Sequence, residues 1–411
     1  MLHHHVLALV ALYCNNKDLF NLSQTTSKLH DACFFVSAVT LHKESPVQQL
    51  SYTYSGLHKV TLQDLDVIRQ LVEVKHLQSP PSSTSLNVLH SVEELDIAGL
   101  QTTDTQDIRV LLKNVKSLKR LNASGLVTTV GALGTLVKSL PPCLCELDLS
   151  RVQQSGFVTF TSLPPKLRRI NLSGLSLNKA ECLSLAAALR GCKSLEEFYE
   201  PCCTSECDTP ILQLHQEMAR ATSAMRTIVT RKPTYSRNPG LVELITKSHH
   251  KLEHVHLCIQ DSIDWFFATV AACAPRYPVL QDVIIRGPVA GQSLLHLSIF
   301  LGKTRVLESL TIMHHNAVFD EGLGHVLAGV PLLVKLRLEG GFNPRSWECL
   351  ADHIGVLTKL RTLEIRSHTR VHNSVYDRLQ AVLLPDCQLQ VYDYDFSCDE
   401  HLDYDLDFDL D

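Results

Sequence analysis

A short pattern of apolar residues, Leu-x-x-Leu-x-Leu with similar apolar replacements, is repeated along most of the 411-residue chain. The eleven steps between its first and last middle positions range from 23 to 30 residues and average about 27. Near-equal steps of this length predict an array of similar structural units stacked in a row. The middle positions are Leu95, Leu121, Leu147, Ile170, Phe198, Ile228, Val255, Val283, Leu310, Leu336, Leu363 and, in a degraded last copy flanked by Gln388 and Asp393, Val391.

Each repeat changes its hydrophobic period from 2 to 3.6, which predicts a short strand followed by a helix. Such a unit cannot bury its apolar face alone, so stacked neighbours share one continuous core. The sequence therefore predicts an α/β solenoid of about 12 strand–helix repeats of about 27 residues. Helical spacing is found at Ile108, Leu111, Leu112 and Val115, at Cys182, Leu185, Ala186 and Leu189, and at Trp347, Leu350, Ile354 and Leu357.

Residues 92–392 resemble leucine-rich-repeat proteins, so the fold class is that of a leucine-rich-repeat solenoid. The segment from Ala186 to Leu195, with Cys192, is similar to the cysteine-containing repeats common in F-box proteins. This resemblance implies a curved array that presents its strands on a concave face.

The first 41 residues lack the repeat and predict a small helical module. Asp18-Leu19, Leu22-Ser23, Ser27-Lys28-Leu29 and Val39-Thr40-Leu41 resemble an F-box. That resemblance implies docking on the adaptor subunit of a cullin–RING ubiquitin ligase, whereas the alternative is a cap over the first open edge of the solenoid. The residues expected to contact the adaptor are Val6, Leu9, Val10, Leu19, Leu22 and Leu29.

Two further segments complete the expected organisation. Residues 42–91 are a degenerate repeat or transition, with helical spacing from Leu62 to Val72. Residues 393–411 hold nine acidic residues and no Lys or Arg, which leaves a net charge of +4 on residues 1–392. Dense like charge predicts a tail that is disordered when free. We expect it to cap the last edge of the solenoid or to fold onto Lys335, Arg337 and Arg366.

Catalytic motifs are absent from the sequence, which predicts a protein that is not an enzyme and needs no cofactor or metal. Gly302-Lys303-Thr304 lacks the first glycine of a phosphate-binding loop. Cys202, Cys203 and Cys207 lack the paired spacing of a zinc site. His254 and His256 are expected to be exposed polar residues, since two imidazoles are too few to hold zinc.

Function is therefore expected on the concave face, where strand alternation places the residues between the buried positions. These pairs are Glu94/Asp96, Arg120/Asn122, Glu146/Asp148, Arg169/Asn171, Glu197/Tyr199, Thr227/Val229, His254/His256, Asp282/Ile284, Ser309/Thr311, Lys335/Arg337 and Thr362/Glu364. Arg286 and Arg366 are expected just after their strands. With Lys335 and Arg337 they make the last third more basic and suit an acidic partner. The candidate partner-binding residues are Arg120, Asn122, Arg169, Asn171, Tyr199, His254, His256, Arg286, Lys335, Arg337 and Arg366.

The preferred function is that of an F-box-like substrate receptor, which brings a protein target to a ubiquitin ligase. One alternative is a scaffold subunit of a larger assembly without a ligase. Another is a regulator of a GTPase, because Ran GTPase-activating proteins also combine leucine-rich repeats with an acidic tail. Scattered cysteines and the lack of a long apolar run favour a cytoplasmic or nuclear protein that binds no membrane. A continuous nucleic-acid track is excluded because it needs far more Lys and Arg.

Overall fold

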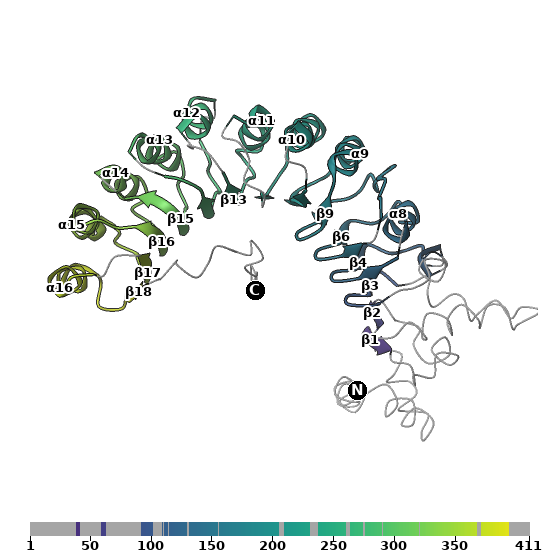
Figure 1. Ribbon diagram of the computed structural model, residues 1–411, viewed down its shortest axis with the longest axis horizontal. Helices are drawn as coiled ribbons and strands as arrows, with labels where there is room; N and C mark the ends of the chain where they lie inside the picture. Colours follow the sequence, from purple (N-terminus) through teal and green to yellow (C-terminus); the bar gives the residue numbers. More distant parts are fainter. Residues whose placement is uncertain are drawn as a thin grey trace, which may run out of the picture. The chain divides into compact units, whose positions relative to one another are not determined.

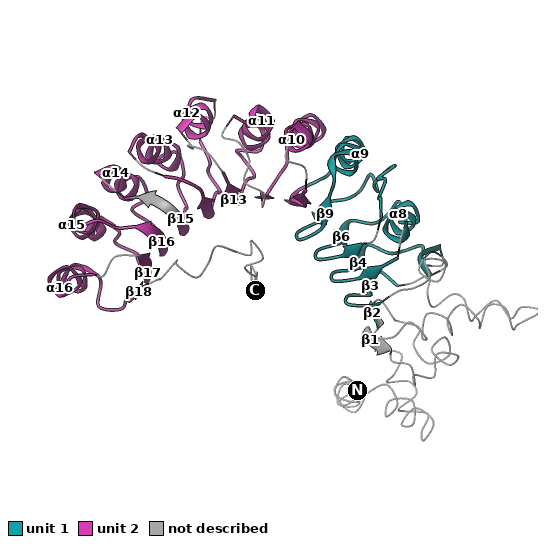
Figure 2. Ribbon diagram, viewed as in Figure 1, with its two compact units in different colours: residues 1–195 teal, residues 196–411 magenta. Residues whose placement is uncertain are grey.

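The computed structural model describes fifteen stretches of the chain between residues 38 and 393, and they fall into two compact units, residues 1–195 and 196–411 (Figure 2). The residues predicted to contact an adaptor, Val6 to Leu29, and the acidic tail beyond Asp393 lie outside the described residues. The described residues are 38–41, 59–62, 92–101, 109, 111–113, 115–129, 131–154, 156–204, 209–230, 237–259, 264–273, 276–289, 291–319, 321–367 and 371–393.

Unit 1 is built on a parallel sheet whose strands follow one another in chain order (Figure 1). Each strand is short, and its middle residue pairs with the middle residue of the next strand, as Leu95 does with Leu121 and Leu147 with Ile170. The strands are β1 (Ala38–Leu41), β2 (Lys59–Leu62), β3 (Glu94–Asp96), β4 (Arg120–Asn122), β6 (Glu146–Asp148) and β8 (Arg169–Asn171).

The sheet of unit 1 begins earlier than the start at residue 92 predicted from the repeat. β1 pairs with β2, and β2 pairs with β3 through Val60 and Leu95. Both strands carry the same pattern, as Val36-x-x-Val39-x-Leu41 and Leu57-x-x-Val60-x-Leu62. Their steps of 21 and 35 residues lie outside the regular spacing, so a search for a constant period misses them.

The outer side of unit 1 is covered irregularly. The helices α8 (Ala132–Lys138) and α9 (Lys179–Leu189) follow β4 and β8, and Leu185 and Leu189 of α9 are buried. The repeat between Leu147 and Ile170 is the shortest, at 23 residues, and its described residues 156–168 form no helix. Val158 and Phe160 are buried there from an extended chain. The prediction of a helix in every repeat is wrong here, because too few residues remain to form one.

The buried Glu181 fixes this extended segment to the next helix. Its Oε1 accepts the backbone N–H of Val158 at 2.7 Å, and its Oε2 accepts that of Asn178, also at 2.7 Å. Asn178 in turn caps α9 by accepting the N–H groups of Ala180 and Glu181. Charge-assisted bonds of this kind are stronger than neutral ones, which explains how a carboxylate is accommodated at 3% exposure.

Unit 2 has the same architecture, with a helix in every repeat and with longer strands from its third strand onward (Figure 1). Its strands are parallel and again follow chain order. They are β10 (Glu197–Tyr199), β12 (Thr227–Val229), β13 (His254–Cys258), β14 (Asp282–Arg286), β15 (Ser309–Val318), β16 (Lys335–Gly341), β17 (Thr362–Ser367) and β18 (Gln388–Asp393).

The helices of unit 2 pack in sequence on one side of its strands and bury their apolar residues against the sheet. Phe267 and Phe300 of adjacent helices, for example, are fully buried with ring centroids 5.4 Å apart. None of the helices in the described residues has both the length and the apolar composition needed to cross a membrane. They are α10 (Thr209–Ala221), α11 (Pro239–Lys247), α12 (Asp264–Cys273), α13 (Gln292–Leu301), α14 (Glu321–Gly329), α15 (Pro344–His353) and α16 (Asn373–Val382).

The strand register confirms the repeat anchors within each unit except for the last one. In unit 2, Phe198 pairs with Ile228, and Leu336 with Leu363, as the pattern predicts. The final copy is displaced by two residues, because Leu363 pairs with Leu389 and not with Val391. The described strands and helices thus form a leucine-rich-repeat fold of the α/β class.

A left-handed residue turns the chain out of four successive strands of unit 1. Gly99, Gly125 and Gly174 have φ angles of 70°, 63° and 73°, and Arg151 occupies the same place with φ 54°. A Cβ atom at Gly125 would meet only the Gly99 backbone, at 3.9 Å. The requirement for glycine at that position is therefore conformational and not steric.

We expect Gly125→Ala to destabilise unit 1 by about 1 kcal/mol, because alanine tolerates a positive φ poorly. The matched control is Gly134→Ala in α8, where the new Cβ makes an ordinary 3.9 Å contact and alanine favours the helix by about 1 kcal/mol. Hydrogen–deuterium exchange of peptides covering β4 and β6 measures both variants. Equal effects of the two substitutions would contradict the conformational explanation.

Candidate functional site

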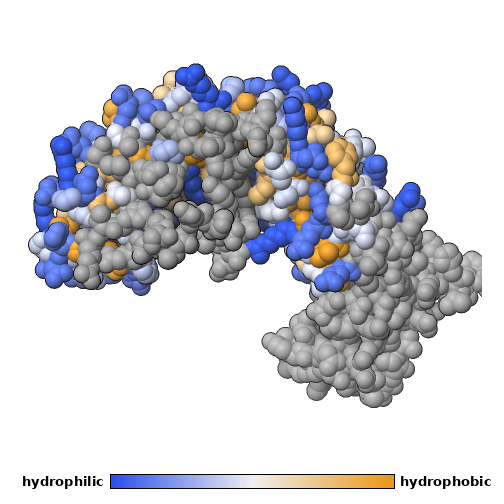
Figure 3. Space-filling view, viewed as in Figure 1, coloured by the Kyte–Doolittle hydropathy of each residue, from blue (hydrophilic) through white to orange (hydrophobic). Residues whose placement is uncertain are grey.

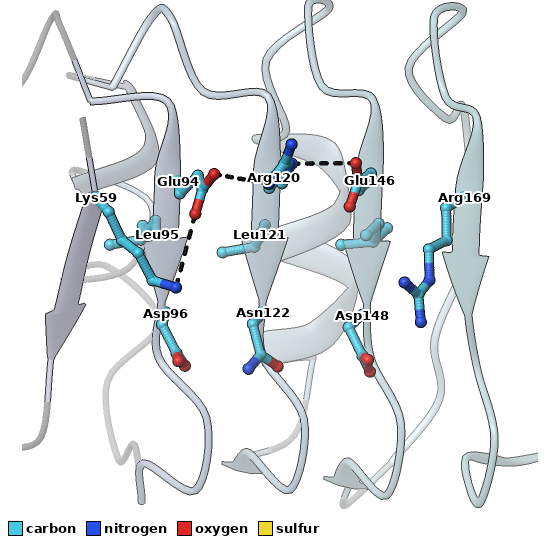
Figure 4. A pocket seen from close by; sticks show the side chains of 11 residues that line it. Lys59, Glu94, Leu95, Asp96, Arg120, Leu121, Asn122, Glu146, Asp148 and Arg169 are labelled. Atoms are coloured by element: carbon cyan, nitrogen blue, oxygen red, sulfur yellow. Dashed lines mark hydrogen bonds and ion pairs between the residues drawn. The ribbon is translucent and has the colours of Figure 1, made fainter. Parts of the chain in front are cut away.

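Five strands of unit 1 present two rows of polar side chains on the sheet face opposite its buried residues (Figure 4). We call these rows together the ladder face. The first row is Lys59, Glu94, Arg120, Glu146 and Arg169, and the second row is Asp96, Asn122, Asp148 and Asn171. All of these residues except Asn171 line an open hollow of about 290 Å³, which runs across strands β2 to β8.

Strand geometry explains why these side chains share one face. Successive residues of a strand point to opposite sides of a sheet. Leu95, Leu121 and Leu147 point into the core and are at most 3% exposed, so the residues before and after each of them point outward. The sheet is held by its own core, and the ladder face therefore has a fixed backbone.

Charges alternate in sign along the first row and pair with their neighbours. Glu94 contacts Lys59 at 3.7 Å and Arg120 at 2.7 Å, and the Nε of Arg120 lies 3.1 Å from Glu146. The Lys59 and Arg120 side chains remain half exposed. Exposed pairs of this kind contribute only about 0–1 kcal/mol to stability, so the side chains can exchange partners at little cost.

The second row is fixed by hydrogen bonds to the turn after each strand. The Oδ1 atoms of Asp96, Asn122, Asp148 and Asn171 each accept the backbone N–H two residues further on, at 2.8–3.1 Å. One atom of each side chain is therefore used by the fold. The other atom, an Oδ2 or an Nδ2, is left over, and Asn171 uses its Nδ2 to donate to Asp148 Oδ2 at 3.0 Å.

Four of the sequence-predicted residues come together on the ladder face: Arg120, Asn122, Arg169 and Asn171. Sequence reasoning missed Lys59, because β2 lies outside the regular spacing. The signal that could have found it is the Leu57-x-x-Val60-x-Leu62 pattern around it.

The remaining predicted residues lie in unit 2, where two of the four expected basic residues, Arg337 and Arg366, form ion pairs. Arg337 contacts Glu339 at 3.1 Å and Glu364 at 3.6 Å, and Arg366 contacts Glu364 at 2.9 Å. Arg366 also lies over the Tyr392 ring, 5.5 Å from its centroid. These pairs offset part of the expected positive charge, and Glu339 was left out of that expectation because β16 is longer than predicted. The binding of an acidic partner by these residues stays a prediction.

Two arginines are also placed differently from the prediction. Arg286 and Arg366 lie within β14 and β17 and not after them, since these strands span five and six residues. Lys335, at the start of β16, is exposed.

His256 and Tyr199 are buried, contrary to the expectation of an open face at these strands. They are 5% and 7% exposed, whereas His254 is half-buried. His256 Nε2 lies 2.6 Å from Asp282 Oδ2. Burial alone would raise the pKa of Asp282, but its hydrogen bond and electrostatic interaction with His256 outweigh burial and lower that pKa.

A buried polar cluster interrupts the core of unit 2 at its first two strands. Glu200 and Thr230 occupy the third pattern position, where Leu257, Ile285 and Leu338 stand in later repeats. Glu200 is fully buried, and its Oε1 lies 3.6 Å from Nε2 of the fully buried His215 in α10. The sequence shows Glu200 and Thr230 only as weak copies of the repeat, and nothing in it points to His215.

The hydrogen bonds around His215 determine its protonation. Asn238 caps α11 by accepting the Leu241 N–H through Oδ1 at 2.9 Å, so its Nδ2 faces His215 Nδ1 at 2.8 Å. Because Nδ2 can only donate, His215 Nδ1 accepts and carries no proton, which makes the ring neutral. Burial likewise lowers the pKa of His215 from 6.5 to about 4.

The described residues contain no cluster of metal ligands, and burial keeps two of their thiols protonated. Within them, no three His, Cys, Asp or Glu side chains come close enough to hold a metal ion. Burial raises the pKa of the Cys192 and Cys258 thiols to about 11 and about 12, so both stay protonated at neutral pH. A protonated thiol is a poor nucleophile. What the ladder face can do is form hydrogen bonds and ion pairs with a bound chain.

No protein-family model matches the sequence, and no curated protein matches it. Solved structures that are similar to this chain include the following two. One is an internalin (InlF) of Listeria monocytogenes, with 12% identity and a TM-score of 0.45, covering 92% of this chain and 95% of the internalin. The other is TLR13 in complex with ssRNA13, with 14% identity and a TM-score of 0.41, covering 87% of this chain and 43% of TLR13.

We expect acid to destabilise unit 2 through His215. Its folded pKa lies below its unfolded pKa, so the unfolded state takes up the proton first. The stability is complete above pH 6.5 and is lost as the pH falls towards 4, by about 2 kcal/mol between pH 7 and pH 5. His215→Asn keeps an acceptor for Asn238 without titrating, so it should lose less stability over this range. Urea unfolding followed by tryptophan fluorescence reports unit 2, because both tryptophans, Trp265 and Trp347, lie there. Identical pH profiles of the two proteins would contradict this assignment.

Proposed function

We propose that this protein is a non-enzymatic interaction subunit that holds a partner protein on the ladder face. The observation that carries the proposal is a hollow bordered by two ordered rows of polar side chains on a rigid sheet. Long preformed faces of repeat arrays suit the binding of extended protein surfaces. The lateral ion pairs are weak enough for a partner to replace them.

A more specific form of the proposal is an F-box-like substrate receptor of a cullin–RING ubiquitin ligase. Residues 1–41 would anchor on the adaptor, and the ladder face would hold the target. The F-box-like pattern at Asp18-Leu19 and Ser27-Lys28-Leu29 supports this form. The pattern ends in Val39-Thr40-Leu41, which forms β1 of the sheet, so such a module would join the solenoid directly. The alternative remains a scaffold subunit without a ligase.

The ladder face is tested with Arg120→Ala in the tagged full-length protein. This change removes the contacts to Glu94 and Glu146 but leaves the core intact. Copurified proteins are then quantified by mass spectrometry. We expect the recovery of at least one stoichiometric partner to change several-fold, because Arg120 holds both glutamates of the first row. Arg361→Ala is the control, since Arg361 forms an exposed pair with Asp386 in unit 2. The same change in partner recovery in both variants would refute a specific role of the ladder face.

The ligase role is tested by deleting residues 1–37. This truncation keeps β1, which a cut at residue 41 would remove from the sheet. An F-box-like receptor should copurify with adaptor and cullin only when residues 1–37 are present. A stoichiometric partner that stays bound without adaptor or cullin in either form would instead establish the scaffold function.

A further inference from the structure

The ladder face has a two-strand period. β3 and β6 both read Glu-Leu-Asp, at residues 94–96 and 146–148, whereas β4 and β8 read Arg-Leu-Asn and Arg-Ile-Asn, at 120–122 and 169–171. Two-carboxylate columns thus alternate with arginine–amide columns across the sheet (Figure 4). Because neighbouring strands are about 4.8 Å apart, equivalent columns recur about every 9.6 Å.

This period matches one backbone conformation of a bound chain. A polyproline II helix has three residues per turn and rises about 3.1 Å per residue, so residues three apart share a face about 9.3 Å apart. Residues three apart in a β-strand lie on opposite faces. In an α-helix the nearest equivalent spacing is seven residues, or about 10.5 Å.

The hydrogen-bonding groups of the second row favour the same kind of chain. Oδ1 of Asp96 and of Asn122 is bound to its own turn, which leaves Asp96 Oδ2 as an acceptor and Asn122 Nδ2 as a donor. A polyproline II backbone makes no internal hydrogen bonds and can use both groups. An α-helix satisfies its backbone internally and cannot.

The charge balance of the ladder face determines which sign of charge the side chains of the bound chain must carry. Arg120 is shared by Glu94 and Glu146. Asp96 and Asp148 are not in these ion pairs, and among the described residues Asp148 accepts hydrogen bonds from the uncharged Ser150 and Asn171. The three cations that line the hollow, Lys59, Arg120 and Arg169, face four carboxylates. The unbalanced charge is therefore negative and lies on β3 and β6.

We propose that the ladder face binds an extended basic segment of the partner protein, in polyproline II conformation, with Lys or Arg residues three apart. The cations lie over the Glu-Leu-Asp columns of β3 and β6, and the backbone between them meets Asn122. This inference rests on the proposed function and specifies the chemistry of the partner.

The test measures fluorescence anisotropy of labelled 12-residue peptides with the full-length protein. The probe is (Arg-Pro-Pro)4, and a peptide of the same composition with its four arginines consecutive is the spacing control. We expect the probe to bind about tenfold more tightly than the control and to weaken as salt is added. Equal binding of both peptides would show that only nonspecific electrostatic attraction holds them, and it would overturn the proposal.

The structure supplies a conservative variant for the same assay. Asp96→Asn keeps the turn bond, as Asn122 shows, and removes one charge. Asp148 is left unchanged, because its Oδ2 accepts a hydrogen bond from Asn171 that an asparagine would lose. We expect Asp96→Asn to weaken probe binding about two- to fivefold, on the scale of one exposed charge pair. Asp377→Asn, on α16, removes the same charge elsewhere and should change nothing.

The outcomes separate this inference from the proposed function. Tighter binding of (Glu-Pro-Pro)4 than of the arginine probe would show that the bound segment is acidic and would overturn the proposed positive charge. Failure of every peptide, while Arg120→Ala still changes the recovery of its cellular partner, would overturn the extended basic segment but leave the proposed function standing. If Arg120→Ala also leaves that recovery unchanged, both fail.

Discussion

The parallel pairing of three-residue strands through one buried apolar residue is the constraint on which unit 1 depends. With Leu95, Leu121, Leu147 and Ile170 in register and almost fully buried, the residues on either side of each must point away from the core. The same register aligns those outward residues into rows. The surface is therefore a by-product of core packing, and its spacing is set by the backbone hydrogen bonds between strands.

Much of this arrangement can be read from the sequence, because burial repeats with a period. The pairing of Phe198 with Ile228 was predicted although the step of 30 residues is the longest, because Met225 and Ile228 keep the apolar pattern. β1 and β2 were not counted as repeats, because the insertions after them change the step while keeping the apolar pattern. The shift from Val391 to Leu389 has another cause: at the last repeat both residues are only half-buried, so the apolar signal no longer distinguishes them.

Pairing of charges is harder to read from the sequence than the position of a side chain. Counting basic residues along the last third suggests an acidic partner, yet Glu339 and Glu364 lie within 3.6 Å of Arg337. The cluster around His215 shows the same limit in the core. Glu200, His215 and Asn238 are far apart in sequence, and only the packing of α10 and α11 on β10 and β12 brings their atoms together.

In the second row of the ladder face, one atom of each Asp or Asn side chain stabilises the turn and the other is left for recognition. Oδ1 accepts the hydrogen bond of the turn whether the residue is Asp96 or Asn122. The second atom alone therefore determines whether a bound partner finds a hydrogen-bond acceptor or a donor. A single-base change between Asp and Asn codons could therefore alter recognition while leaving the fold untouched. Such repeats can therefore accumulate Asp and Asn substitutions on this surface without any variant losing its fold. The binding specificity of the ladder face can change at one strand at a time.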